Sequence, residues 1–357
     1  MPQKISPQRP ADVMSDGDIF DAIAEDYLAF TLDYDLGVRE ASFELQAGTE
    51  NSTLVSLLGN GIIAFYPNSN AEQSPQKSIV LSCAIHGNET APIEICSHII
   101  KELLNQSIRS RHRLLFLFGN IPAMHIAERF VEENLNRLFT RKSISQSQEG
   151  PRAVALMDVL DNFFSHAPGE KFHYDLHTAI RPSKNEKFAV YPFLHGKAYS
   201  KQQLGFLGAC DVKTILLSQS PTTTFSYYSS VTHSAHAFTV ELGKVKPFGE
   251  NNMGRFVAVN QKLRELITQS DVSQPDYPEC ELEIYTVNQV INKSKDDFRL
   301  HFADDIANFA EFKQGQILAS ESGAVYKAEY DGEAIVFPNA NVAIGQRAIL
   351  TVIPYVI

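Results

Sequence analysis

Runs of apolar residues alternate with amphipathic stretches through the middle of the chain. Four short apolar runs indicate buried strands, at residues 78–85, 113–119, 172–177 and 236–242. Longer stretches with apolar residues at helical spacing accompany them, at about 90–105, 152–165 and 251–269. Because strands alternate with helices, the pattern predicts an α/β fold in which helices cover a mixed or parallel sheet.

The N-terminal part follows another pattern. Residues 11–35 carry apolar side chains at helical spacing, which predicts one or two amphipathic helices. We expect them to form an N-terminal helical segment, 1–45, that packs on the central domain. Short strands are expected at 42–45 and 62–66, with a break at Gly59-Asn60-Gly61.

A polar stretch with two prolines, Asp271–Pro278, predicts a domain boundary. The central domain is therefore expected at 46–270, and a smaller C-terminal domain at 276–357. Alternating patterns in the second part indicate an all-β domain. Two of its expected strands flank Asp331-Gly332, a signal for a two-residue β-hairpin.

The composition is that of a globular protein with an acidic balance. Hydrophobic residues make up 44% of the 357 positions, charged residues 20%, and the formal net charge is −11. No basic stripe offsets this charge, which argues against a nucleic acid or an anionic membrane as partner. Residues 1–10 lack the apolar core of a secretory signal, and no stretch approaches the ~18 apolar residues of a membrane span. The chain has four scattered cysteines, Cys83, Cys96, Cys210 and Cys280. They fit reduced thiols, so we expect a cytoplasmic protein.

The segment that follows the expected strand 78–85 carries two good metal ligands. His86 and Glu89 lie three residues apart at an expected strand-to-helix turn. Imidazole and carboxylate both bind zinc, and open α/β sheets place their ligands at the carboxyl ends of strands. A catalytic zinc needs three protein ligands, and His177, which ends a second apolar run, is the expected third. Taken alone, such a spacing also arises by chance, and a strand-end His is usually only hydrogen-bonded.

Two further segments carry polar groups that a site would need. Glu241 is the one acid within the apolar run 238–243, and a buried carboxylate is costly unless it is paired or near a metal. Residues 129–139 hold guanidinium and amide groups close together, those of Arg129, Asn134, Asn136 and Arg137. Together with His86, Glu89 and His177, these groups predict one metal-centred site.

The order of these motifs resembles the zinc carboxypeptidase superfamily, and within it the branch that holds aspartoacylase and succinylglutamate desuccinylase. The sequence is most similar to that of the desuccinylases in four segments, HGNETAPIE, ENLNRLF, DLHTAIR and VELGKVKPFGEN. The resemblance covers roughly residues 50–270 closely, and the remainder by architecture. It implies a zinc-carboxypeptidase-like mixed sheet flanked by helices, with a smaller C-terminal all-β domain.

The resemblance also implies roles for individual residues. One zinc per chain would be held by His86, Glu89 and His177, with Glu241 as general base. Arg129 matches the arginine that stabilises the oxyanion, and a surface arginine is the alternative. Asn136 and Arg137 match the pair that grips a substrate carboxylate. Arg181 is a candidate for a second carboxylate, and a solvated loop charge is the equal alternative. Tyr227 falls where relatives carry a substrate-facing tyrosine, although the adjacent Tyr228 leaves the register open.

The chain departs from the wider family at two positions. Asn134 stands where relatives carry an Asp that accepts from a metal-bound His, and its amide oxygen could still accept, without charge. Val231 stands where the aspartoacylase branch carries an arginine, which argues against specificity for N-acetylaspartate. His233 and His236, three residues apart near Glu241, could suggest a second metal, which we do not expect.

The resemblance implies a zinc amidohydrolase that acts on a small anionic N-acyl amino acid. Its expected substrate is N2-succinylglutamate, cleaved to succinate and glutamate in arginine catabolism. One alternative is an aspartoacylase-like deacylase or a carboxypeptidase on the same scaffold. Another is a zinc-free binding protein that has kept the fold.

Overall fold

The computed structural model describes residues 9–11, 14–35, 37, 39–68, 77–165, 167 and 169–357. Thirteen strands of these residues join in one sheet. They are β3 (Ala41–Leu45), β4 (Thr53–Gly59), β5 (Ile62–Pro67), β6 (Ser78–Cys83), β7 (Arg113–Phe118), β8 (Lys171–Ala179), β9 (Phe188–Tyr191), β10 (Thr214–Leu217), β11 (His236–Lys244), β12 (Glu283–Asn292), β14 (Ala310–Phe312), β17 (Glu333–Val336) and β18 (Arg347–Pro354). Their order across the sheet is β14-β17-β18-β12-β10-β9-β11-β8-β6-β7-β5-β4-β3.

Smaller sheets and the helices complete the described chain. One small sheet pairs β1 (Arg9–Pro10) with β2 (Tyr34–Asp35), and another joins β13 (Arg299–Leu300), β15 (Ile317–Glu321) and β16 (Ala324–Lys327). The helices are α1 (Asp16–Asp33), α2 (Thr90–Leu104), α3 (Ile121–His125), α4 (Glu149–Ser165), α5 (Lys201–Ala209), α6 (Phe225–His233) and α7 (Val257–Thr268), with short 3-10 turns at η1 (Leu135–Arg137) and η2 (Met253–Phe256). No helix among the described residues is both long and apolar enough to cross a membrane.

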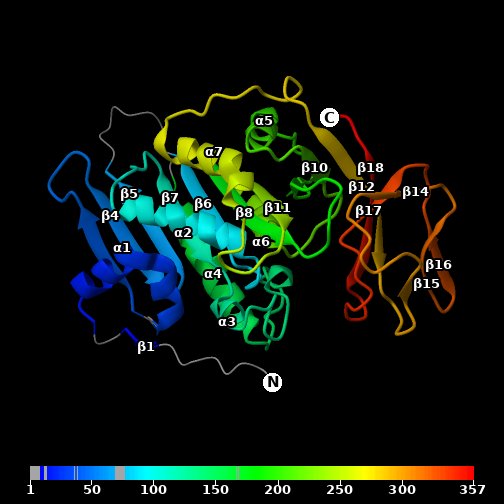
Figure 1. The fold of residues 1–357 in the computed structure, drawn as a ribbon, viewed down its shortest axis with the longest axis horizontal. Helices are drawn as coiled ribbons and strands as arrows, with labels where there is room; N and C mark the ends of the chain where they lie inside the picture. The colour runs from blue at the N-terminus through cyan, green and yellow to red at the C-terminus, as the bar shows by residue number, and fades with distance from the viewer. Residues whose placement is uncertain are drawn as a thin grey trace.

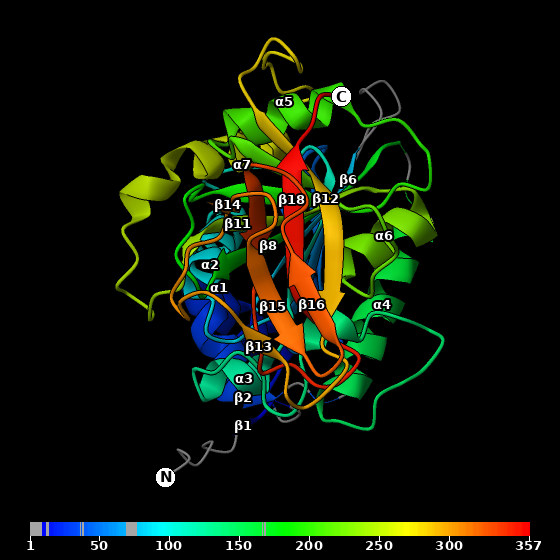
Figure 2. The ribbon, with the colours of Figure 1, turned by 90° about the vertical axis from the view of Figure 1, so that its right-hand side faces the viewer.

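Helices cover both faces of the sheet, as Figures 1 and 2 show. One hydrophobic cluster joins α1, α2, α5 and α7 to one face, and a second joins α4 and α6 to the other. The central strand β6 is buried at all six positions and lies between β7 and β8, parallel to both. A strand covered on both faces must be apolar along its whole length, which explains the continuous apolar runs in the sequence. The predicted α/β fold with a mixed sheet and flanking helices is confirmed.

The C-terminal strands extend the same sheet. β12 pairs in parallel with β10, and β18 and β17 follow it in antiparallel order. In Figure 1 these strands form the end of the molecule opposite to α1. The sheet therefore runs from the central part into the C-terminal part without a break. The domain limits 1–45, 46–270 and 276–357 stay predictions.

Two local expectations need correction. The hairpin predicted at Asp331-Gly332 is wrong, because β16 pairs with β15 while β17 pairs with β14 and β18. The buried carboxylate of Glu333 accepts backbone N–H groups of Glu329 and Tyr330, which turns the chain from one sheet to the other. The break expected at Gly59–Gly61 is a hairpin, and the strand before it, β4, went unrecognised. Within α1, the backbone leaves helical geometry at Asp26, which agrees with the expectation of one or two helices at 11–35.

Candidate metal centre and active site

His86 and Glu89 lie in the turn between β6 and α2. The turn begins after Cys83 at the carboxyl end of the buried strand, and Glu89 immediately precedes the first helical residue. A Cβ on Gly87 would stand 2.1 Å from the carbonyl carbon of Ala123, so only glycine lets this turn pack against α3. The Gly87 N–H also donates to the Arg129 carbonyl. Close packing of the turn thus fixes both side chains, which are 3% and 2% exposed.

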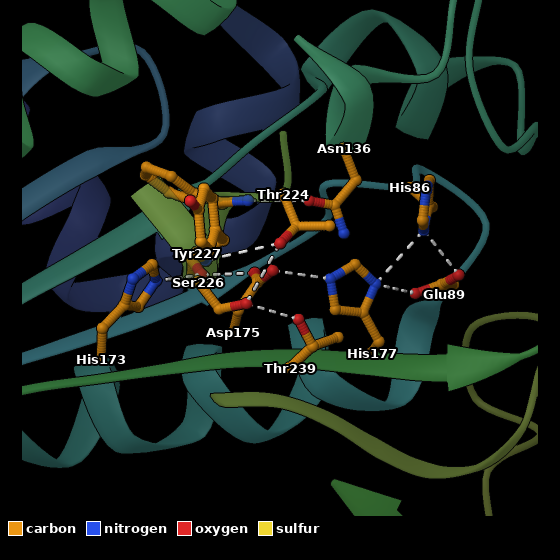
Figure 3. A network of polar contacts seen from close by, with 12 residues as sticks. His86, Glu89, Asn136, His173, Asp175, His177, Thr224, Ser226, Tyr227 and Thr239 are labelled. Carbon is orange, nitrogen blue, oxygen red and sulfur yellow. Dashed lines mark hydrogen bonds and ion pairs between the residues drawn. The ribbon is translucent and has the colours of Figure 1, made fainter. Parts of the chain in front are cut away.

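His177 reaches the same place from the neighbouring strand β8. Its Nδ1 lies 2.8 Å from Glu89 Oε2 and 3.2 Å from His86 Nδ1, while His86 Nδ1 lies 2.8 Å from Glu89 Oε1. Figure 3 shows the His177 ring between Asp175 on one side and His86 with Glu89 on the other. One ligand atom from each of His86, Glu89 and His177 lies within 4.8 Å of the others.

The hydrogen bonds on the outer side of each ring fix the tautomers. His177 Nε2 lies 2.9 Å from Asp175 Oδ2, and His86 Nε2 lies 3.0 Å from Asn134 Oδ1. Both oxygens accept, so each Nε2 donates, and the Nδ1 atoms of the two rings face each other and Glu89, where a metal ion would take the place of a proton. Metal-bound histidines are held by this kind of outer hydrogen bond. Two imidazole nitrogens and a carboxylate oxygen form a donor set that zinc prefers. The three residues therefore fit a zinc ion, with Asn134 as the outer acceptor of His86.

The charges around the cluster favour a cation. Burial lowers the pKa of His86 to about 4, and the nearby Arg129 charge adds to the effect, so this imidazole is neutral and able to bind a metal at neutral pH. Burial alone would also lower the pKa of His177, but the Asp175 and Glu89 carboxylates outweigh it and raise that pKa well above its ordinary value. Two carboxylates thus flank one buried ring, and they would stabilise a positive ion beside it.

Glu241 stands on β11, with His177 as its partner in the register with β8. It is buried, and its Oε2 has no hydrogen-bond partner among the described residues. Burial, with the Glu89 charge as a second cause, raises the pKa of Glu241 to about 7. An unpaired buried carboxyl group is costly, and a pKa near the operating pH suits a general base. Glu241 is therefore close to the cluster and chemically available.

The polar residues of segment 129–139 lie around the cluster. Arg129 Nη1 donates to Glu89 Oε1 at 2.7 Å. Asn136 is buried, and its Oδ1 accepts the N–H of Phe225, which leaves its Nδ2 as the end that could donate to a ligand. Arg137 donates to its neighbour's carbonyl, and burial, followed by the Arg129 charge, lowers its pKa to about 10. These guanidinium groups make the surroundings positive, which favours an anionic ligand.

The two remaining candidates occupy the periphery. Arg181 Nη1 donates to the carbonyl of Asp304, in the C-terminal part. Tyr227 is half-buried on α6, and its hydroxyl lies 2.9 Å from His195 Nε2. Tyr228 donates instead to Asp161 on α4, so its hydroxyl has a structural partner. Of the two tyrosines, Tyr227 is the less buried.

A buried polar chain behind His177 was not anticipated from the sequence. Ser82 Oγ donates to Asp175 Oδ1 at 2.5 Å and lies 2.8 Å from His173 Nε2. His173 Nδ1 lies 2.5 Å from Ser229 Oγ. Asp175 precedes His177 by two residues on β8, so both side chains project to the same face of the strand. This Asp-x-His spacing is the sequence signal for Asp175 as the partner of His177. By contrast, His233 binds Asp161 and His236 stacks on Phe172.

The chain matches known proteins over most of its length. Residues 75–267 match the succinylglutamate desuccinylase/aspartoacylase catalytic domain, and residues 280–355 match the AstE/AspA barrel-sandwich hybrid domain. A succinylglutamate desuccinylase of Pseudoalteromonas atlantica is 56% identical over 309 residues, which cover 85% of this chain and 87% of the relative. One of Idiomarina loihiensis is 48% identical over 337 residues, 93% of this chain and 96% of the relative.

Solved structures give the same result. The succinylglutamate desuccinylase of Vibrio cholerae superposes with a TM-score of 0.83 at 33% identity, covering 92% of this chain and 95% of that one. The enzyme of Chromobacterium violaceum gives a TM-score of 0.79 at 34% identity, covering 93% and 98%. The motifs, the fold and the arrangement of the site all lead to one conclusion: this chain belongs to the succinylglutamate desuccinylase/aspartoacylase family.

Proposed function

We propose that this protein is a zinc-dependent amidohydrolase that cleaves N2-succinylglutamate to succinate and glutamate. The observation that carries the proposal is the convergence of His86, Glu89 and His177 beside an unpaired buried carboxyl group, Glu241, with basic groups around them. The relatives named succinylglutamate desuccinylase, up to 56% identical over most of the chain, support the choice of substrate.

His86 Nδ1, Glu89 and His177 Nδ1 would hold one zinc ion. Bound there, zinc supplies Lewis acidity toward water and toward the amide carbonyl. Asn134 and Asp175 keep the two imidazole rings in the ligand tautomer through their Nε2 groups. The pair of carboxylates, Glu89 and Asp175, offsets the charge of the ion.

Glu241 moves the proton in the reaction. Its carboxylate takes a proton from the attacking water as the water oxygen bonds to the succinyl carbonyl carbon. It then gives that proton to the glutamate nitrogen as the C–N bond breaks, so the products are a carboxylic acid and an amine. The pKa of Glu241, raised by burial to about 7, suits both directions of transfer.

The guanidinium groups orient the substrate and stabilise charge. Arg129, held by Glu89, would donate to the developing oxyanion, an arrangement that needs no reorganisation during the reaction. Arg137 and the Nδ2 of Asn136 would bind a carboxylate of the amino acid, since a guanidinium fork fits both oxygens. Arg181 stays a predicted contact of the succinyl carboxylate, and Tyr227 a predicted substrate contact.

The proposed setting is cytoplasmic arginine catabolism. The four cysteines are free thiols, three of them buried, which fits a reducing compartment. An N-acyl amino acid deacylase of aspartoacylase type, or a carboxypeptidase, remains the alternative on this scaffold.

Substrate selectivity tests the proposal. If a desolvated guanidinium meets the succinyl carboxylate, an acetyl group leaves it unpaired, at a cost of about 2 to 5 kcal/mol. Since a tenfold change in rate corresponds to about 1.36 kcal/mol, kcat/KM should fall by roughly 30-fold to several thousand-fold for N-acetylglutamate. The measurement is kcat/KM of purified protein for N2-succinylglutamate, N-acetylglutamate, N-acetylaspartate and a peptide.

Two variants refine this test. Arg137→Ala should weaken the succinyl and acetyl substrates alike, because they share the amino-acid carboxylate. Arg181→Ala should lower kcat/KM more for the succinyl substrate than for the acetyl substrate, and so reduce the ratio between them. If an acetyl substrate is cleaved as well as N2-succinylglutamate, the desuccinylase proposal is wrong and the aspartoacylase-like alternative replaces it.

A second prediction concerns the orientation of His177. Asp175→Asn removes the charge that faces Nε2 and turns one of the two acceptor oxygens into a donor, in conflict with Ser82 Oγ–H. Loss of such an outer partner typically costs about 10- to 100-fold in metal affinity, and we expect that range for zinc in competition with a chelator. Asp161→Asn, on α4 and paired with His233 of α6, is the matched control and should bind zinc normally. Unchanged affinity in Asp175→Asn would remove this residue from the zinc site.

A further inference from the structure

Arg347 is the first residue of β18, in the C-terminal part, and aromatic side chains link it to the strands that carry the site. Its guanidinium carbon is 5.5 Å from the centre of the Phe337 ring. The Phe337 ring lies 5.6 Å from the Phe188 ring, and Phe188 is the register partner of Glu241 on the neighbouring strand. Two aromatic rings therefore connect Arg347 to the strand of the proposed base.

Backbone hydrogen bonds hold this connection in place. The Phe337 N–H donates to Asn308 Oδ1 at 2.9 Å. The Asn308 N–H donates to the Pro182 carbonyl at 2.9 Å, and its own carbonyl accepts the Lys184 N–H at 3.0 Å. Pro182 and Lys184 lie in the loop that follows β8, the strand of His177. The aromatic support of Arg347 is thus attached to the central domain at a short distance along the chain from a proposed zinc ligand.

The charge of Arg347 has no acidic partner in the described part of the chain. Its Nε is buried and makes no hydrogen bond there, and no described carboxylate forms an ion pair with it. Burial, followed by the charges of Arg137 and Arg129, lowers the pKa of Arg347 to about 9. The three guanidinium groups therefore lie near one another, and among the described residues only Arg129 has a carboxylate partner, Glu89.

Arg152, a partly buried arginine with structural partners, provides a comparison for Arg347. Its Nε and Nη2 donate to three backbone carbonyls, those of Gly119, Asn60 and Phe118. Such bonds compensate the cost of burying the charge. Arg347 has no comparable set, and its buried Nε stays available to a bound anion.

We propose that Arg347 binds the side-chain carboxylate of the glutamate in the substrate, so that the C-terminal domain selects the amino acid that is released. The inference rests on the proposed function, in which Arg137 binds the other carboxylate of the same glutamate. Arg137 is the like charge that affects Arg347 most, ahead of Arg129. Two neighbouring guanidinium groups fit a dicarboxylic amino acid, whose two carboxylates are separated by only a few bonds.

The test compares two substrates that differ only at this carboxylate, N2-succinylglutamate and N2-succinylglutamine. The amide of the second has the same shape but no charge. We expect the wild type to prefer the glutamate compound by roughly 30-fold or more in kcat/KM, and Arg347→Met to lose most of this preference. The Met variant keeps an apolar stem against Phe337, and its activity toward the glutamine compound should stay within a few-fold of wild type. Arg299→Met, an exposed arginine of the same C-terminal part, is the matched control and should behave as wild type.

Two outcomes would overturn the assignment. An equal loss toward both compounds would make Arg347 a structural residue. A loss that instead follows the acyl group, succinyl against acetyl, would assign Arg347 to the succinyl carboxylate. Arg347→Lys, which keeps the charge but not the fork, provides a second variant if the Met protein does not fold, and it should retain part of the preference.

A binding measurement separates this inference from the proposed function. Glutamate should raise the melting temperature of the wild type more than glutamine does, and the difference should shrink in Arg347→Met. If the wild type fails to cleave N2-succinylglutamate, the proposed function is wrong. The difference in melting temperature between glutamate and glutamine still decides whether Arg347 recognises the glutamate side chain. Equal protection by glutamate and glutamine in the wild type would reject the site.

Discussion

Glu241→Gln should keep the fold and the zinc and lose at least ~10²-fold in kcat, the usual contribution of a positioned base. The amide occupies the same volume and cannot take a proton from water. Because Glu241 Oε2 has no hydrogen-bond partner among the described residues, the substitution breaks no bond of that oxygen. It also removes a buried acid next to Glu89, so the melting temperature should stay the same or rise.

Three measurements on one preparation separate the role of Glu241 from a structural one. Zinc content, melting temperature and kcat are compared with those of the wild type and of Glu102→Gln. Glu102 lies near the other end of α2 and pairs with Arg264 on the surface, so its variant should have normal turnover. Near wild-type kcat in Glu241→Gln would exclude Glu241 as the base. A fall in zinc content would instead move this residue into the metal site.

The strands that carry the site could be predicted from the sequence because their burial is extreme. β6 and β8 are buried along almost their whole length, so they appear as short, largely apolar runs that also hold a few buried polar residues. The carboxyl ends of these two parallel strands meet at one edge of the sheet, which brings His86 close to His177. The apolar pattern of the sequence and the geometry of a parallel sheet were therefore sufficient to predict that His86 and His177 lie close together.

The sequence was less informative wherever a contact depends on tertiary packing. Asn134 could be named as an acceptor, but only the folded chain brings its Oδ1 to His86 Nε2. The role of Asp175 likewise depends on the folded chain, which brings its two oxygens to His177 Nε2 and Ser82 Oγ. Arg347 carries no local signal at all, since it reaches the site through the packing of Phe337 on Phe188.

Turn signals failed for a related reason. Asp331-Gly332 has the sequence of a hairpin, and Gly332 does adopt a positive φ of 81°. The strands on either side nevertheless pair elsewhere, because Glu333 is buried and binds Gln289 and Asn288 from β12 as well as its own turn. Side-chain hydrogen bonds of one buried acid outweigh the local turn preference, and such bonds cannot be read from a four-residue pattern.

Removal of any one of the three proposed ligands should remove most of the zinc. We expect about one zinc per chain in the wild type, and His86→Ala, Glu89→Ala and His177→Ala should each lose most of it, because two ligands rarely hold a catalytic zinc. Activity should be abolished by exhaustive chelation and return when zinc is added back. Elemental analysis and turnover of the same samples provide the measurement.

The control for these variants is another buried histidine, His112. Its ring lies 2.8 Å from the Gln269 carbonyl and accepts the Lys77 N–H, so His112→Ala removes a buried imidazole that has only structural partners. This variant should lose stability and keep its zinc, whereas the three ligand variants should lose zinc even where they remain folded. Glu89→Ala should have a second effect, because it also leaves Arg129 without its carboxylate partner. Full activity of the wild type after complete chelation would disprove the metal hypothesis, since Glu241 and the arginines would then have to activate water and the amide carbonyl without a Lewis acid.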